Sequence, residues 1–308
     1  MYKYFFRHFG LVPLVLCILW LLPCQVAGEE KTHKDVRASI LAGTWYPGTP
    51  DALTKTVQGY LSEARVPSPD GTLKAIIVPH AGYRYSGGVA AYAYRLLQGS
   101  RFTRVILIGP SHRVAFRGVS VNLQSAYKIP LGMVPVDQKT GRKLIDTGPN
   151  IRWLRKAHAL EHSLEIQLPF LQTVLQDFQI VPVVMGEQDI KTCSDLADTL
   201  IQVLGDSPDT LLLASTDLSH FHNYKQAKDL DLKFIEQVQR FDPKGLLKDL
   251  LSGKCEACGA GPVITTLLTA RKLGADQAVI LKYANSGDVT GDHSRVVGYM
   301  SAALVSDR

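Results

Sequence analysis

The sequence lacks any dense run of lysine and arginine with interleaved aromatic residues. Its 308 residues carry a formal net charge of +6. Two of those charges, Lys3 and Arg7, lie in the first 28 residues, which hold no acidic residue, so the remainder carries +4. A mild excess that is spread along the chain excludes the electrostatic footprint of a nucleic-acid-binding protein. We therefore expect no nucleic acid among the partners.

The motifs of two hydrolase classes are also absent. No His-Glu-x-x-His sequence is present, so a zinc protease of that type is not indicated. Ser215 and Ser219 follow an apolar run, but no Gly-x-Ser-x-Gly elbow surrounds either, which makes both weak candidates for a nucleophile. Internal repeats, low-complexity tracts and linkers are missing after residue 35. That absence favours a single domain in the body of the chain.

Cysteine is scarce, with five residues in the whole chain. Three of them, Cys193, Cys255 and Cys258, lie beyond residue 28, after the signal peptide predicted below. If the protein is exported, this odd number leaves at least one thiol without a disulfide partner. The Cys255-Glu-Ala-Cys258 pair has no second pair beside it, so it is weak evidence for zinc, and a local disulfide is the alternative. Cys258 also precedes a predicted helix, whose dipole would stabilise a thiolate and favour metal binding.

The amino-terminal segment has the three parts of a secretory signal peptide. Lys3 and Arg7 precede an almost wholly apolar stretch from Leu11 to Leu22, and small residues follow at 26–28. An uncleaved anchor and a lipoprotein box around Cys24 are the alternatives. We expect a signal peptide over residues 1–28 and an exported body over residues 29–308. That body would be periplasmic or at the extracytoplasmic face of a bacterial membrane, which it would touch only through the signal or a lipid anchor.

The body of the chain alternates short apolar runs with helical patterns. Hydrophobic residues make up 46% of the sequence and charged residues 20%, which is ordinary for a globular protein with one large core. Runs rich in β-branched residues predict buried strands at 75–78, 105–108, 180–185, 211–214, 279–283 and 296–305. Because helical patterns separate these runs, the sequence predicts an α/β fold whose sheet is covered by helices on both faces.

Proline limits several of the remaining elements. Pro130 and Pro135 exclude a central strand over 116–135, which is expected to form a hairpin or edge material. A helix over 160–175 is expected to be kinked or interrupted at Pro169. Another helix is expected to begin near residue 230.

Two histidines directly follow predicted strands. His80 comes after the strand at 75–78 and His112 after the strand at 105–108, each behind a proline. Loops at the carboxyl ends of parallel strands carry function, so both imidazoles are predicted at the same rim of one sheet. Neutral imidazole is the commonest protein metal ligand and the usual general base near neutral pH. Two of them on one rim indicate a site, although each alone could be satisfied within a turn.

Two further segments place ionisable residues beside apolar ones. After the fourth predicted strand, Asp217 could orient an imidazole by accepting its second N–H, or Asp217 or His220 could cap the next helix. On a helix, Glu161 and Glu165 would share one face, with His162 nearby. A buried network and a polar helix face both fit that second segment.

Seven stretches in order along nearly the whole body resemble the Memo family. This family supplies protein B of the AmmeMemoRadiSam system, a bacterial gene set that also encodes an AMMECR-type protein and a radical-SAM protein. The stretches are AGTWYPG (42–48), PHAGYRYSG (79–87), IGPSH (108–112), EHSLEIQLPF (161–170), STDLSH (215–220), CGAGP (258–262) and NSGDVTGDHSRVVGY (285–299). The resemblance implies a three-layer α/β/α fold, a single domain around a mostly parallel or mixed sheet, similar to that of class III extradiol dioxygenases. Those enzymes bind non-haem Fe(II) through two histidines and a carboxylate.

The same resemblance implies roles for individual residues. His80, His112 and Cys258 would be the metal ligands, with Asp217 and His220 at the pocket. A thiolate in place of a carboxylate is a softer ligand that is compatible with iron or copper. Fe(II) is the expected ion, copper the second choice and zinc the third. The expected partners are an unidentified small molecule and proteins of the same gene set.

Three functions are compatible with these features. In the first, the metal site performs redox or dioxygenase-type chemistry on a small molecule, Asp217 or His220 moves protons, and Glu161 and His162 support the pocket. In the second, the pocket only binds a metal, a ligand or a partner, because a shared fold does not transfer a function. A zinc hydrolase at the same site is the third.

Overall fold

The computed structural model describes residues 35–66 and 70–307. The predicted signal peptide lies outside the described residues, so the boundary at residue 28 stays a prediction. The described residues form one compact unit. None of the described helices is both long and apolar enough to cross a membrane.

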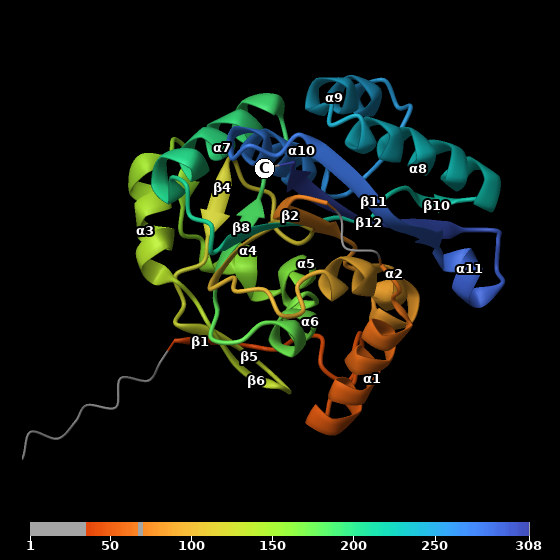
Figure 1. Cartoon of the computed structure of the whole chain (residues 1–308), viewed down its shortest axis with the longest axis horizontal. Coiled ribbons are helices and arrows are strands. Elements are labelled where there is room, and N and C mark those ends of the chain that lie inside the picture. Colours follow the sequence, from red (N-terminus) through yellow and green to blue (C-terminus); the bar gives the residue numbers. More distant parts are fainter. Residues whose placement is uncertain (1–34, 67–69, 308) are drawn as a thin grey trace, which may run out of the picture. The chain divides into compact units, whose positions relative to one another are not determined.

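A central sheet organises the described part of the chain (Figure 1). Its nine strands there are β2 (Thr72–Val78), β3 (Arg104–Pro110), β4 (Val119–Val121), β7 (Ile151–Arg152), β8 (Gln179–Met185), β9 (Thr210–Ser215), β10 (His220–His222), β11 (Gln277–Asn285) and β12 (Val296–Ser306). Their order is β10-β12-β2-β9-β3-β8-β4-β7, and β11 also pairs with β12. The four middle strands β2, β9, β3 and β8 are parallel, while β12 and β4 flank them in antiparallel pairing.

Helices cover both faces of this sheet. One core contains residues of α1 (Pro50–Glu63), α2 (Tyr83–Arg95) and α6 (Leu168–Val174). The opposite core contains residues of α3 (Gln138–Thr147), α7 (Ile190–Leu204), α8 (Tyr224–Gln239), α9 (Pro243–Leu251) and α10 (Ala260–Lys272). In β2, Ile76 and Val78 belong to the first core, and Ala75 and Ile77 belong to the second. The central strands are apolar throughout because both of their faces are buried, and the expected three-layer α/β/α fold is confirmed.

A second, smaller sheet lies beside the first. It joins β1 (Val36–Ala38), β5 (Ala126–Ile129) and β6 (Gly132–Pro135), with β5 and β6 forming a hairpin. The hairpin expected from Pro130 and Pro135 is therefore present. The short strand β4 in the same segment pairs instead with β8 of the central sheet.

Two predicted helices differ in their bounds. The segment at 160–175 is split into α5 (His162–Glu165) and α6, and Pro169 lies in the first turn of α6 rather than at the break. Proline is well tolerated there because the first N–H groups of a helix have no partner within the helix. Helix α8 begins at Tyr224, earlier than expected, because the Asn223 side chain accepts from the Gln226 N–H and caps it.

Three parallel strands end at one edge of the sheet. Val78 of β2 is in register with Ser215 of β9, and Ile108 of β3 is in register with Ala214. The loops that carry His80, His112 and Asp217 therefore leave the sheet side by side, as predicted.

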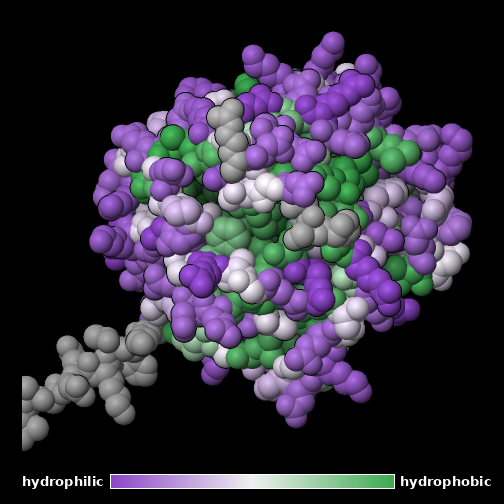
Figure 2. All heavy atoms as spheres, in the orientation of Figure 1, coloured by the Kyte–Doolittle hydropathy of each residue, from purple (hydrophilic) through white to green (hydrophobic). Residues whose placement is uncertain are grey.

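The remaining helices are α4 (Arg155–Ala159) and α11 (Ser286–Thr290). On the face shown in Figure 2, hydrophilic side chains form most of the surface, and hydrophobic ones are visible between them toward its centre.

Candidate metal centre

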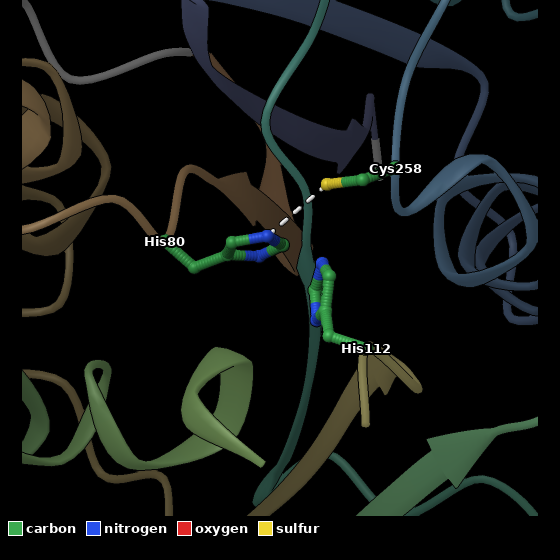
Figure 3. A group of neighbouring side chains, drawn as sticks. All are labelled: His80, His112 and Cys258. Carbon is green, nitrogen blue, oxygen red and sulfur yellow. Dashed lines mark hydrogen bonds between the residues drawn. The ribbon is translucent and has the colours of Figure 1, made fainter. Parts of the chain in front are cut away.

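The three predicted metal ligands converge at this edge. One ligand atom from each of His80, His112 and Cys258 lies within 4.8 Å of the others. The Nε2 atom of His80 is 3.1 Å from the sulfur of Cys258, and the centroids of the two imidazoles are 5.1 Å apart. Figure 3 shows the three side chains pointing toward one another from the ends of β2 and β3 and from the loop before α10.

A buried serine determines the proton position on His80. Ser215 donates its hydroxyl hydrogen to the carbonyl oxygen of Ser163 at 2.7 Å, because a carbonyl can only accept. The Ser215 oxygen therefore accepts from Nδ1 of His80 at 2.9 Å and from the Gln167 amide at 2.9 Å. His80 is protonated on Nδ1, so its Nε2 carries a lone pair, which faces the sulfur of Cys258. Burial lowers the pKa of His80 well below its usual value, and the ring is neutral.

Glu161 holds the second imidazole in the same tautomer. Its carboxylate accepts from the ring Nδ1 of His112 at 2.9 Å, from the His112 backbone N–H at 2.7 Å and from the Ser163 N–H at 2.9 Å. Burial opposes ionisation of this carboxyl, but the donors outweigh burial and lower its pKa to about 2. An ionised carboxylate only accepts, so His112 donates from Nδ1, and Nε2 is the ring nitrogen that would bind a metal ion. A carboxylate behind a histidine is the usual support of a metal ligand.

A buried ion pair in turn holds the segment of Glu161. Arg37 donates to the carbonyl oxygens of Glu161 at 2.8 Å and of His158 at 2.7 Å, and it pairs with Glu165 at 2.6 Å. Glu165 also accepts from the Tyr46 hydroxyl at 2.8 Å. Glu161 and Glu165 are 1% and 0% exposed, so this segment is a buried network and not a polar helix face. Arg37 could not be predicted as part of this network from the sequence, because its partners lie more than 100 positions away.

Cys258 does not have the stabilised thiolate that its place before α10 led us to expect. Burial and then the carboxyl of Asp217 raise the pKa of the thiol, which outweighs the dipole of the helix. Cys193, Cys255 and Cys258 are all free thiols, so the predicted alternative of a Cys255–Cys258 disulfide is not what the structure shows. A coordinated metal ion removes the proton from a thiol, so a cation at this site would reverse the direction of the shift.

Asp217 lies at the site without orienting an imidazole ring. Its Oδ1 accepts from the backbone N–H of His80 at 2.7 Å, and the ring N–H of His80 goes to Ser215 instead. Burial raises the pKa of Asp217 to about 6. His220 lines the same cavity, but the ligand groups found among the described residues do not include it. Neither residue caps the next helix, because Asn223 does so.

A third imidazole, that of His162, packs against the first two. Its ring centroid is 4.3 Å from that of His112, 5.3 Å from that of His80 and 4.7 Å from the ring of Trp45. Burial lowers the pKa of His162 to about 3, so this ring is neutral as well. His112, Glu161 and His162 form a second group of close ligand atoms, but the Glu161 oxygens are already occupied by donors. Trp45 lies in the AGTWYPG stretch but was not among the predicted site residues.

The imidazoles lie at the floor of a cavity of about 860 Å³. Two imidazole nitrogens and one sulfur, which lie within 4.8 Å of one another, are a donor set that suits iron, copper or zinc. The residues present therefore fit a bound transition metal. The cavity beside them is large enough for a small organic molecule.

Comparison with known proteins identifies the family of this chain. Residues 37–303 match the profile of the family described as Memo-like protein. This chain belongs to the Memo family. A MEMO1 family protein of Methanopyrus kandleri is 36% identical over 282 residues, which cover 88% of this chain and 99% of the relative. Another, from Sulfolobus acidocaldarius, is 37% identical over 280 residues, which cover 86% and 98% of the two chains.

The Memo fold is also similar to a solved structure. An uncharacterised protein of Escherichia coli K12 superposes with a TM-score of 0.51 at 14% sequence identity, covering 75% of this chain and 99% of that chain. At this identity the similarity shows the fold alone. The resemblance predicted from the seven motif stretches is confirmed by the family match, whose range includes all three candidate ligands.

Proposed function

We propose that this Memo protein binds a single metal ion through His80, His112 and Cys258 and carries out redox chemistry on a small molecule in the adjoining cavity. The observation that carries the proposal is the convergence of three ligand atoms within 4.8 Å. Both imidazoles are fixed by buried acceptors in the tautomer that frees Nε2. A site that only contained three polar side chains would not need two independent supports for the same tautomer.

Iron is the first choice of metal and copper the second. A thiolate is a soft ligand that both ions accept, and a site with three protein ligands leaves coordination positions open. A redox-active ion held there would supply electron transfer and a place for the substrate and for dioxygen. Zinc would fit the same donors without redox chemistry, and it remains the choice for a hydrolytic function.

The neighbouring residues would handle protons and exclude water. Asp217 contacts the backbone of His80, and its Oδ2 is 3.9 Å from the ring Nε2, so it is placed to hold a proton beside the metal ligands. His220 lines the cavity and would exchange protons with the substrate side. Glu161 acts through His112 and is a positioning residue. His162 and Trp45 close the floor with neutral rings, which lowers the local dielectric constant and strengthens charge interactions there.

The place of action follows from the predicted signal peptide. We propose that the body is exported and works in the periplasm or at the extracytoplasmic face of the membrane, with proteins of its gene set as partners. Free thiols are harder to keep reduced there. Cys255 lies three residues from Cys258, so oxidation of the pair would remove one ligand and make metal loading dependent on redox conditions.

Metal content after purification without oxygen tests the proposal. The mature protein is expected to retain a single ion per chain, and His80→Ala, His112→Ala and Cys258→Ser are each expected to lose most of it. His293→Ala, in an exposed loop outside the group, is the matched control. An absence of metal from the wild type, or full metal content in the triple variant, would rule out this site.

Oxygen uptake separates an enzyme from a binding protein. With the metal-loaded protein, oxygen consumption in the presence of a panel of catechols supports redox catalysis. Stoichiometric metal without oxygen consumption would leave a metal- or ligand-binding function instead.

A further inference from the structure

The cavity above the histidines has a rim that the proposed chemistry does not use. Arg84 and Tyr85 of α2, Phe221 of β10 and Arg295 in the loop before β12 line it. The guanidinium carbon of Arg84 is 5.8 Å from the ring centroid of Tyr85, and that of Arg295 is 5.1 Å from the ring centroid of Phe221. Two arginine–aromatic pairs therefore belong to the cavity that contains the metal centre.

Two guanidinium groups give this rim positive charge, which the carboxylate of Asp292 offsets in part. Among residues 35–66 and 70–307, neither the Arg84 nor the Arg295 guanidinium forms an ion pair or a hydrogen bond. The Asp292 carboxylate instead accepts from the backbone N–H and the hydroxyl of Ser294. The amino-terminal end of α2 faces the same space and has no side-chain cap, so its partial positive charge adds to that of the arginines.

The conformation of Phe221 is unusual for an aromatic residue. Its φ is +63°, in the left-handed region that non-glycine residues rarely adopt, and the residue is 60% exposed. The pairing of β10 with β12 shifts register between His220 and His222, so Phe221 occupies a β-bulge. Bulges beside active sites redirect a side chain. Here the bulge turns an apolar ring toward the cavity and under Arg295, where the ring stays largely exposed.

We propose that this rim selects a small aromatic anion: its carboxylate or phosphate pairs with Arg84 and Arg295, and its ring stacks on Phe221. Arginine binds such anions through paired N–H donors, and the exposed phenylalanine supplies a flat apolar surface. A ligand held in this way extends toward His80 and the other metal ligands. The inference rests on the proposed function for the reaction at the metal, but the binding step needs only the rim.

Calorimetric titration with four simple probes tests this selectivity on the mature, metal-loaded protein. Benzoate carries both features, benzamide lacks the charge, cyclohexanecarboxylate lacks the flat ring, and phenyl phosphate replaces the carboxylate. Benzoate or phenyl phosphate is expected to bind on the order of tenfold more tightly than the other two. Comparison of those two distinguishes a carboxylate from a phosphate. Their affinity is expected to fall as salt is added, because the contacts are partly exposed.

Substitutions assign the binding to named residues. Arg84→Gln and Arg295→Gln are each expected to weaken benzoate on the order of tenfold and to leave benzamide unchanged, whereas Arg117→Gln, at an exposed arginine outside the cavity, should change neither. Phe221→Leu is expected to weaken benzoate but not cyclohexanecarboxylate. Equal binding of benzoate and benzamide, equal effects of the Arg117 and Arg295 substitutions, or no binding of either anion at millimolar concentration would overturn the inference.

Metal content distinguishes failure of this inference from failure of the proposed function. The rim variants are expected to keep the metal of the wild type. Conversely, Cys258→Ser is expected to lose metal while it still binds benzoate at the rim. Anion selectivity that survives without the metal would retain the rim as a binding site even if the redox proposal fails.

Discussion

The floor of the cavity is held by buried hydrogen bonds, whereas its rim consists of exposed side chains. At the floor, Ser215 and Glu161 each fix the tautomer of one histidine. At the rim, Arg84 and Arg295 contact aromatic rings and have no counter-ion within the described residues. Ligands that must meet a metal ion gain from rigid placement. Side chains that select among ligands remain free until one arrives, and therefore add little to the stability of the fold.

The largest expected effect is on stability and comes from the buried Arg37–Glu165 ion pair. Arg37→Met leaves the fully buried Glu165 without its cation, so we expect the free energy of unfolding to fall by about 3–5 kcal/mol. Urea denaturation of the purified body measures this change. Arg155→Met, which removes an exposed pair with Asp35, is the control and should leave the midpoint unchanged. Equal midpoints for the two variants would show that the buried network does not support the floor.

The next effect concerns metal affinity. Glu161→Gln keeps the size of the side chain but removes the charge that fixes His112, so we expect metal affinity to fall about 10- to 100-fold. Competition with a chelator gives the ratio, and Glu187→Gln, at a half-exposed carboxylate, serves as the control. Unchanged affinity in Glu161→Gln would mean that the tautomer of His112 is set in another way.

Acid should lower the free energy of unfolding through the buried residue His158. Burial, with the nearby charge of Arg37, lowers the pKa of His158 to about 3. Below the usual histidine pKa of about 6.5, His158 is protonated in the unfolded chain but stays neutral in the folded protein. This histidine therefore contributes full stability above that pH and loses it progressively as the pH falls toward 3.

Denaturation at several pH values between about 4 and 5.5, where the unfolded histidine is almost fully protonated and the folded one almost fully neutral, checks this dependence. In this range, the slope of the unfolding free energy against pH should be smaller in His158→Gln than in the wild type. The difference should be about 1.4 kcal/mol per pH unit. Identical slopes in the two proteins would contradict burial of a neutral His158.

The smallest effect is expected at the rim. Phe221→Gly removes an exposed ring and allows the positive φ without strain, so the unfolding free energy should change by no more than about 0.5 kcal/mol. The same denaturation experiment measures it. A loss comparable to that of Arg37→Met would show that the rim is a structural element and would remove the contrast with the floor.

Much of the fold could be predicted from local pattern. Buried strands read as continuous apolar runs, so β2, β3, β8 and β9 were located within a few residues, and parallel strands place their following loops at one edge. That geometry brought His80 and His112 together in advance. The bounds of α5, α6 and α8 were less accurate, because a cap such as Asn223 and a tolerated proline such as Pro169 depend on the neighbouring backbone.

The hydrogen bonds and pKa values of the site residues could not be predicted from the sequence. Asp217 was expected to orient an imidazole or to cap a helix, but the ring N–H of His80 goes to Ser215, and the thiol of Cys258 has a raised pKa despite its place before a helix. Both outcomes depend on burial and on competing partners, which have no local pattern. The same is true of Phe221, whose positive φ arises from a bulge between two strands.

By itself the sequence determined the alternation of strands and helices, the histidines at two strand ends and the membership of the Memo family. Only the tertiary structure decided which proton each histidine carries, that Arg37 supports the floor and that two arginines share one rim. The physical reason is distance along the chain. Arg37 and Glu165 are 128 positions apart, and His80 and Ser215 are 135 positions apart. These donors and acceptors therefore meet only when the chain folds.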